Sequence, residues 1–170
     1  AFAANNFLPD SAPETVARFL LDTKALDKSA IGEFLGSGDD RNVAIMHAFV
    51  DRMDLRGMQF MQALRGFLQH FRLPGESQKI DRFMLKFAEK YVSDNPGSFA
   101  NADTVYVLSY SVVMLNTDLH SPQVKQRMTL EEFVRNNRGI DDGSDLDRGL
   151  LEGIYRDIQE HEIVLDSERG

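Results

Sequence analysis

A chain of 170 residues with 42% hydrophobic and 27% charged residues has the size and composition of a single globular domain. The absence of cysteine excludes disulfides, thiol catalysis and zinc–thiolate sites, and a net charge of −8 argues against general binding of nucleic acid. No apolar run reaches the roughly 18 residues of a membrane span, so we expect no membrane insertion by this chain. Because the chain begins at Ala1 rather than at Met, we expect a domain cut from a longer protein.

The negative charge is concentrated at one end of the chain. Residues 141–170 hold 10 acidic and 3 basic side chains, so this end accounts for −7 of the net charge. A solvated helix and tail is the simplest interpretation, and a specificity or regulatory surface is the alternative. The rest of the chain is close to neutral, which leaves room for a local basic face.

Helical periodicity predicts four helices in the first half of the chain, whereas strand signals are weak throughout. A capping box at Ser11, with Pro13 in the first turn, begins the first helix, and Asp27 caps the second. A third helix begins near Asp39, and a fourth follows Asp54.

The second half of the chain predicts four more helices, and with them an all-α fold. The fifth helix begins after a Pro-Gly turn and carries a basic stripe opposite its apolar face, which is either a solvated face or a partner surface: Lys79, Arg82, Lys86 and Lys90. The sixth covers roughly 101–120. Thr129 begins a capping box for the seventh, and Asp145 is the predicted cap of the eighth.

The segment 101–120 is the most apolar of the chain and has two seams. One seam is wholly apolar: Val105, Leu108, Val112, Leu115 and Leu119. The other mixes polar and apolar side chains: Val107, Tyr110, Ser111, Met114 and Asp118. A helix that is apolar on both sides is normally central in its fold. The mixed seam suits a groove wall that meets another protein, and a buried polar network is the alternative.

The turn before the fifth helix presents one carboxylate. Pro74 presets φ at the first corner and Gly75 tolerates a positive φ at the second, which places Glu76 on or beside the first turn of the helix. There the helix dipole stabilises an exposed carboxylate by roughly 0.3–1 kcal/mol. Glu76 is therefore either a helix-capping residue or an acid displayed to a partner.

Other sites of chemistry find no support in the sequence. The phosphate-binding motifs GxxxxGK and GxGxxG do not occur, and the four histidines lack metal-ligand spacing. A calcium loop starting at Asp141 fails because Gly143 and Leu146 stand where a ligand and the turn glycine are required. No pair of carboxylates stands out for hydrolysis. We therefore expect no metal site in this chain.

Two stretches resemble the signatures of the Sec-seven domain family. Residues 71–82 match the first, F-R-L-P-G-E followed by Q-K-I-D-R, and residues 106–120 match the second, Y-V-L-S-Y through M-L-N-T-D-L-H. The similarity covers roughly 13–160 of a single domain spanning 1–170. Together with residues 41–49, the two signatures resemble most the large Golgi-acting exchange factors of the Sec-seven/BIG type. Ser77, where many members have Ala, and Ser121, where some have Asn, are small departures.

This resemblance implies a fold and a partner. The fold would be an all-helical, right-handed superhelix of about ten helices, with a hydrophobic groove beside the Glu76 loop. The partner would be an Arf-family small GTPase, on which such domains catalyse GDP release and GTP loading without covalent chemistry or a cofactor of their own. Parent proteins of this family act in vesicular traffic on the cytosolic face of Golgi or trans-Golgi membranes.

The resemblance also implies roles for individual residues. Glu76 would be the glutamic finger, which displaces Mg²⁺ and the β-phosphate of GDP in the partner. The groove that binds the switch regions would use Tyr110, Met114, Asn116, Asp118, Phe71, Leu73 and Ser121. A second set resembles members inhibited by brefeldin A, which would bind in the interface with Arf-GDP: Tyr110, Ser111, Met114, Asp118 and Met128. A binding-only scaffold is the first rival to exchange, and a carboxylate-dependent hydrolase is a distant second.

Overall fold

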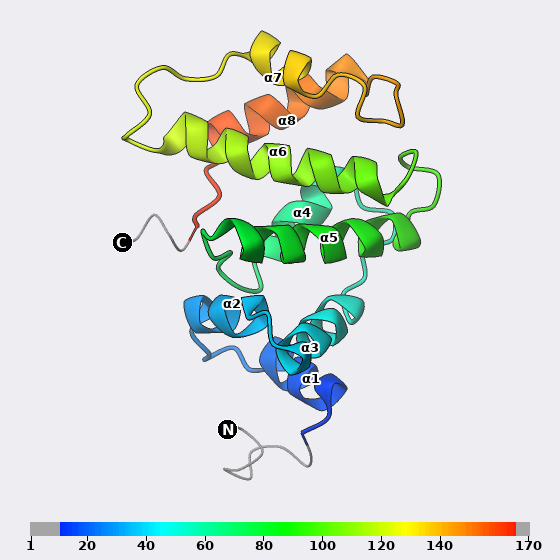
Figure 1. The fold of residues 1–170 in the computed structure, drawn as a ribbon, viewed down its shortest axis with the longest axis vertical. Coiled ribbons are helices and arrows are strands. Elements are labelled where there is room, and N and C mark those ends of the chain that lie inside the picture. Colours follow the sequence, from blue (N-terminus) through cyan, green and yellow to red (C-terminus); the bar gives the residue numbers. More distant parts are fainter. Residues whose placement is uncertain (1–10, 166–170) are drawn as a thin grey trace.

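The computed structural model describes residues 11–165, which form a stack of helices without a sheet (Figure 1). The helices within these residues are α1 (Pro13–Asp22), α2 (Lys28–Gly36), α3 (Asp40–Asp51), α4 (Phe60–Leu68), α5 (Ser77–Asp94), α6 (Ala102–His120), α7 (Leu130–Asn136) and α8 (Arg148–Glu160). In the described range, no helix is both long enough and apolar enough to cross a membrane.

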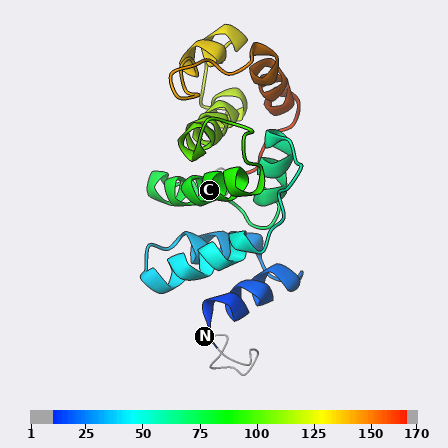
Figure 2. The same ribbon diagram turned by 90° about the vertical axis from the view of Figure 1, so that its right-hand side faces the viewer.

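The helices are layered roughly in chain order from one end of the molecule to the other (Figure 2). At one end α3 packs against α1 and α2, and at the other α8 packs against α6 and α7. The long helices α5 and α6 lie side by side in the middle and share the most extensive contact between elements. Because each of these two helices carries one of the signatures, the stack brings the two signatures together at its centre.

An aromatic cluster forms the core beneath the start of α5. The ring of Phe71 stacks on Phe83 with centroids 4.6 Å apart and meets Phe67 edge-on at 5.2 Å. Phe67 in turn lies 5.0 Å from Phe87, and all four rings are buried. Aromatic pairs at such separations add to the free energy gained by burial. The chain that leads into the Glu76 turn is therefore fixed to the core by its own phenylalanine.

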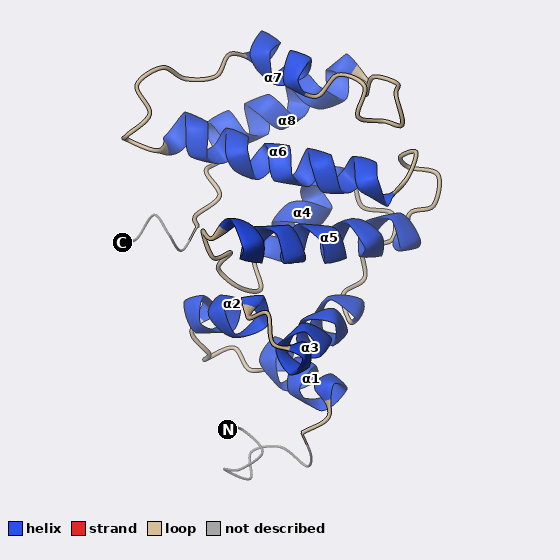
Figure 3. Cartoon of the chain, in the orientation of Figure 1, coloured by secondary structure: helices blue, strands red, loops and turns tan. Residues whose placement is uncertain are grey.

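The all-α prediction is confirmed for residues 11–165 (Figure 3). All eight helices expected from periodicity are present there, whereas the figure of about ten implied by the resemblance is too high for these residues. Asp27 caps α2 by accepting a hydrogen bond from the Ser29 N–H at 3.2 Å. The capping box predicted at Thr129 is also formed, with both of its hydrogen bonds to Glu132.

One predicted capping box and two predicted helix starts are wrong, although α1 does begin with Pro13 in its first turn. The N-cap of α1 is Ala12, which makes no side-chain cap, so Ser11 does not form a capping box. Asp54 accepts hydrogen bonds from Arg56 instead of starting a helix, and α4 begins only at Phe60. Asp145 accepts from the Gly139 N–H at 2.7 Å, while the neighbouring Asp147 caps α8. Asp54 and Asp145 both lie close to a helix start, but their carboxylates accept hydrogen bonds from other groups.

The basic stripe of α5 is not a solvated face. Lys79 and Lys86 form ion pairs with Glu33 at 2.6 Å and Asp51 at 2.7 Å, and their side chains are only 17% and 14% exposed. Arg82 donates to the carbonyl of Gly36, the last residue of α2. The stripe therefore holds α5 against the preceding layer, and these contacts leave it covered rather than open to a partner.

Candidate functional site

The turn between α4 and α5 has a buried root and an exposed tip. Phe71 and Leu73 are each 1% exposed, and Pro74 is also buried. Gly75 and Glu76 follow at the surface, where the Glu76 side chain is 70% exposed. Gly75 does not adopt the positive φ expected for it. The backbone that leads to Glu76 is therefore anchored in the core up to Pro74, two residues before the exposed carboxylate.

Helix α2 supports the root of the turn from behind. The Arg72 N–H donates to the Lys28 carbonyl at 3.0 Å, which joins the turn to the start of α2. One turn later on α2, a Cβ at Gly32 would lie 1.9 Å from the Arg72 carbonyl oxygen. No side chain fits at that distance, so glycine at position 32 is what permits the backbone of the turn to rest on α2.

Glu76 caps α5 through its backbone only. Its carbonyl accepts from the N–H groups of Lys79 and Ile80 at 3.0 Å each, and its side chain makes no capping hydrogen bond. The expected alternative of a capping residue is therefore confirmed for the backbone of Glu76, while its side chain stays free of the cap. The carboxylate lies 3.5 Å from Lys79 Nζ, which is held more closely by Glu33. Glu76 thus has one weak ion pair and is otherwise displayed to solvent.

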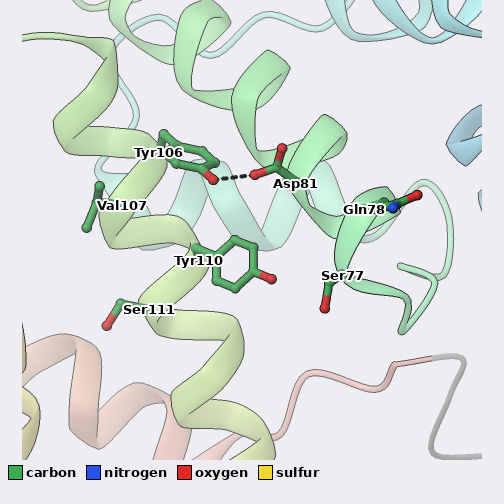
Figure 4. Close-up of a pocket in the computed structure, with 7 residues that line it drawn as sticks. All are labelled: Ser77, Gln78, Asp81, Tyr106, Val107, Tyr110 and Ser111. Carbon is green, nitrogen blue, oxygen red and sulfur yellow. Dashed lines mark hydrogen bonds between the residues drawn. The ribbon is translucent and has the colours of Figure 1, made fainter. Parts of the chain in front are cut away.

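A groove of about 540 Å³ opens between the first turns of α5 and the middle of α6 (Figure 4). It is lined by Ser77, Gln78, Asp81, Tyr106, Val107, Tyr110 and Ser111. Since Ser77 follows Glu76 directly, the groove lining begins one residue after the exposed glutamate. Its size is that of a site for a small ligand or for a few side chains of a protein partner.

A tyrosine pair covers the α6 wall of this groove. Tyr106 and Tyr110 extend from α6 towards α5, with ring centroids 6.3 Å apart (Figure 4). Tyr106 donates a hydrogen bond to Asp81 across the groove, and this bond, with partial burial and the charge of Asp81, raises the pKa of Tyr106 to about 12. Tyr106 is therefore a neutral donor at physiological pH, and it ties α5 to α6.

Several of these lining residues were missed by the sequence interpretation. Ser77, Gln78 and Asp81 were assigned no role in the groove, although they share one face of the first turns of α5. Tyr106 precedes Tyr110 by four residues, one helical turn, which is the signal that could have added it to the mixed seam.

The mixed seam of α6 does face outward, as expected of a groove wall. Tyr110 and Ser111 line the groove, and Met114 is 43% exposed one turn further along. Asp118 and Met128 lie beyond the groove lining, where the Asp118 carboxylate accepts a hydrogen bond from the Met128 N–H. Ser121 ends α6, with its N–H bonded to the Thr117 carbonyl at 2.9 Å. These last three residues shape the loop that leaves α6.

Three of the residues expected in the groove are inside the protein instead. Asn116 is 0% exposed, and its amide group donates to the Ile163 carbonyl at 2.7 Å and accepts from the Ile163 N–H at 2.8 Å. Phe71 and Leu73 are buried in the core under the turn. Because none of the three reaches the surface, they support the groove and the turn from beneath rather than line them.

Residues 11–165 contain no group of three or more histidine or carboxylate side chains arranged to hold a metal ion. The carboxylates of the rejected calcium loop have internal roles. Asp141 accepts from the Ala100 N–H at 2.8 Å, as Asp145 does from Gly139. The exposed Glu76 and the partly aromatic groove that begins one residue later form an arrangement suited to engaging another macromolecule.

Comparison with known proteins places the chain in a family. A profile of the Sec7 domain matches residues 1–163, and the chain belongs to the Sec7 domain family. It is 61% identical over 163 residues to the ADP-ribosylation factor guanine nucleotide-exchange factor SEC7 of Saccharomyces cerevisiae, covering 96% of this chain and 8% of that protein. It is 58% identical over 166 residues to the exchange factor sec71 of Schizosaccharomyces pombe, and the match covers 98% of this chain and 9% of that protein.

A plant relative and two solved structures are similar as well. Brefeldin A-inhibited guanine nucleotide-exchange protein 2 of Arabidopsis thaliana is 53% identical over 154 residues, 91% of this chain and 9% of that protein. The crystal structure of the Sec7p catalytic domain matches with a TM-score of 0.88 and 59% identity, covering 95% of this chain and 86% of that one. The structure of ARF1-GDP bound to a Sec7 domain complexed with brefeldin A matches with a TM-score of 0.89 and 39% identity, covering 98% and 85%. The chain spans less than a tenth of the length of these three curated relatives.

Proposed function

We propose that this domain accelerates the exchange of GDP for GTP on an Arf-family GTPase, with Glu76 as the carboxylate that enters the nucleotide site. The observation that carries the proposal is the position of Glu76, whose side chain is 70% exposed at the tip of a turn with a buried root, one residue before the first residue that lines the groove between α5 and α6. The names of the relatives as exchange factors support it.

Electrostatics explain how one carboxylate could release a nucleotide. A GTPase holds GDP largely through its β-phosphate, which a P-loop lysine and Mg²⁺ neutralise. A carboxylate placed there repels the phosphate, pairs with the lysine and competes for the position of the metal. Two unit charges about 4 Å apart interact by about 4 kcal/mol at an effective dielectric near 20, roughly a thousandfold in an equilibrium constant. The domain needs no covalent step and no cofactor of its own.

The groove would supply the binding free energy that offsets the lost nucleotide contacts. Tyr110 and Met114 offer an aromatic ring and a half-exposed thioether side chain on neighbouring turns of α6. Residues of these kinds are common in the buried centres of protein interfaces. The structure of ARF1-GDP with a Sec7 domain, a neighbour in fold, supports the same type of partner for this chain.

The test is the release of a fluorescent GDP analogue from purified Arf. Wild-type domain should accelerate release, and Glu76→Lys should remove most of the acceleration, by up to about a thousandfold, because it reverses the charge at the phosphate. Glu14→Lys makes the same charge change at an exposed position of α1 and should exchange like wild type. Circular dichroism melting checks that all three proteins are equally folded.

The outcomes separate exchange from its rivals. If the wild-type domain does not accelerate GDP release, the proposed exchange activity is wrong and the binding-only scaffold is the remaining hypothesis. If Glu76→Lys exchanges as fast as Glu14→Lys, the activity stands but the carboxylate mechanism fails. A binding-only scaffold would retain its affinity for Arf in both variants and accelerate nothing.

We further propose that brefeldin A inhibits this domain by binding in its interface with Arf-GDP. Tyr110 and Ser111 line the groove, and Asp118 and Met128 hold the loop at the end of α6. Replacing Tyr110 by Phe and Asp118 by Ser should relieve inhibition in the GDP-release assay while leaving exchange measurable. Full inhibition of the double variant by the same concentration of brefeldin A would contradict this assignment.

The site of action would be the cytosolic face of Golgi or trans-Golgi membranes. Recruitment there would depend on other parts of a longer parent protein, as the small share of the relatives' length covered by this chain suggests.

A further inference from the structure

A second cavity lies behind the Glu76 turn and shares no lining residue with the groove. It has a volume of about 210 Å³. Its walls come from the start of α2, the end of α4, the root of the turn and the C-terminal segment 162–164. The lining residues are Lys28, Arg65, Leu68, Gln69, Phe71, Arg72, Glu162, Ile163 and Val164.

Arg72 brings an unpaired guanidinium group to this cavity. Its Nη1 is sealed from solvent, and within the described residues it has no hydrogen-bond partner. No ion pair joins Arg72 to a carboxylate in that range either. Buried polar groups in folded proteins are nearly always paired, and an unpaired buried donor or charge is strongly unfavourable. Because Nη1 is sealed against protein atoms, an anion in the cavity would meet the other N–H groups of the Arg72 side chain, which lines the cavity.

The other charges at the cavity favour a negatively charged acceptor. Lys28 lines the cavity with an exposed side chain. Its backbone carbonyl accepts the hydrogen bond from the Arg72 N–H. Arg65 is offset by Asp157, with Nη2 and Oδ1 2.8 Å apart. Glu162 is the one carboxylate in the lining. Counting Lys28 and Arg72 as positive and Glu162 as negative, the cavity lining carries one net positive charge.

His70, beside Lys28 on the same side of the molecule, does not add to this charge. Burial, and to a lesser degree the charge of Lys28, lower the pKa of His70, so it is neutral at physiological pH. The cations that an anion would meet are thus Arg72 inside the cavity and Lys28 at its mouth. Both belong to the near-neutral part of the chain, outside the acidic C-terminal end.

We propose that this cavity binds a phosphate-type oxyanion, with Arg72 as its central ligand and Lys28 as the second cation. A guanidinium group presents paired N–H donors that match the oxygens of a phosphate, and a lysine contributes a second point charge. The bound anion would join α2 to the root of the Glu76 turn, where the Arg72 backbone already contacts Lys28 and Gly32. Its source is either free phosphate or the phosphate monoester headgroup of a lipid.

Thermal unfolding in inorganic phosphate tests the site without reference to nucleotide exchange. The test is designed to detect a dissociation constant on the order of 1 mM. At about 10 mM phosphate the melting temperature should then rise by about 3 °C over chloride buffer of equal ionic strength. No rise would overturn the proposal.

Three variants at single positions locate the effect. Arg72→Gln and Lys28→Gln should each remove most of the rise, and Lys28→Gln keeps the test valid even if Arg72→Gln folds poorly. Arg18→Gln removes one exposed cation on α1 and should retain the full rise. Equal rises in all three variants would mean that phosphate acts non-specifically, and the site would be rejected.

Glu162 decides whether the cavity is open to an external anion. Glu162→Gln should increase the rise, because it removes the carboxylate that competes with phosphate. If phosphate stabilises Glu162→Gln but not wild type, Glu162 is itself the partner of Arg72 in the native protein and the proposal is wrong.

Vesicles distinguish the two sources of phosphate. Phosphatidylcholine vesicles containing phosphatidic acid, whose headgroup is a phosphate monoester, are compared with vesicles containing phosphatidylserine at equal charge. Cosedimentation with phosphatidic acid alone, competed by inorganic phosphate and lost in Lys28→Gln, assigns the site to a lipid. Phosphate-dependent stabilisation without cosedimentation assigns it to a soluble phosphate compound.

Discussion

Glu76 shares its nearest cation with a second carboxylate. Lys79 Nζ lies 2.6 Å from Glu33 Oε2 and 3.5 Å from Glu76 Oε1, and the hydrogen bond to Glu33 is the main cause of the raised pKa of Lys79. Because Lys79 is held mainly by Glu33, Glu76 is left with the longer and weaker of the two ion pairs. If Glu76 acts on a phosphate, Glu33 is a positioning residue for that action.

This arrangement predicts a loss of activity that a second substitution restores. Glu33→Gln should release Lys79 to pair with Glu76 and slow GDP release about two- to fivefold, the effect of a partly exposed ion pair. Adding Lys79→Gln should return the maximal rate, at saturating Arf, to near wild type. A double variant as slow as Glu33→Gln would show that Glu33 only docks α2. No activity in wild type would instead reject the proposed function itself.

At the scale of the element, the mixed seam of α6 predicts a binding residue. Met114 is 43% exposed, so Met114→Ala should leave stability within about 0.5 kcal/mol of wild type while weakening Arf binding about tenfold. Val164→Ala is the control, because Val164 is 50% exposed but lies outside the groove lining. Titration of labelled Arf measures both affinities, and equal affinities of the two variants would remove Met114 from the contact set.

The helices themselves were largely predictable because their signals are local. The apolar seam of α6 needs only a 3.6-residue period, and the caps at Asp27 and Thr129 need only a side chain two or three residues from its N–H partner. Where two acids compete for one helix start, as Asp145 and Asp147 do before α8, sequence pattern gives no basis for choosing between them.

The errors in the candidate site come from partners distant in sequence. The cover over the basic stripe of α5 is supplied by Glu33 and Asp51 on two earlier helices. The resemblance placed Asn116 in the groove, yet its partner is the backbone of Ile163, 47 residues later. For Glu76 the sequence left capping and display as alternatives, and the structure shows both: its backbone caps α5 while its side chain is 70% exposed.

At the scale of the whole molecule, the C-terminal segment ties separate layers together. Residues 162–165 have no regular pattern in sequence, yet Ile163 and Leu165 are only 7% and 3% exposed. Asn116 of α6 binds both backbone groups of Ile163, and Arg65 of α4 donates to the His161 carbonyl at 2.6 Å. The segment thus connects α4, the cavity behind the turn and α6.

Asn116→Ala should therefore cost stability rather than contact with a partner. It removes both hydrogen bonds and leaves the Ile163 N–H and carbonyl buried and unpaired, a loss of about 3 kcal/mol in the free energy of unfolding. Urea denaturation at constant m-value measures this loss. Asn136→Ala, an exposed position on α7, should change the same free energy by less than about 0.5 kcal/mol. If Asn116→Ala is as stable as Asn136→Ala but binds Arf more weakly, then Asn116 acts in the interface, and its buried position in the free domain must open when the partner binds.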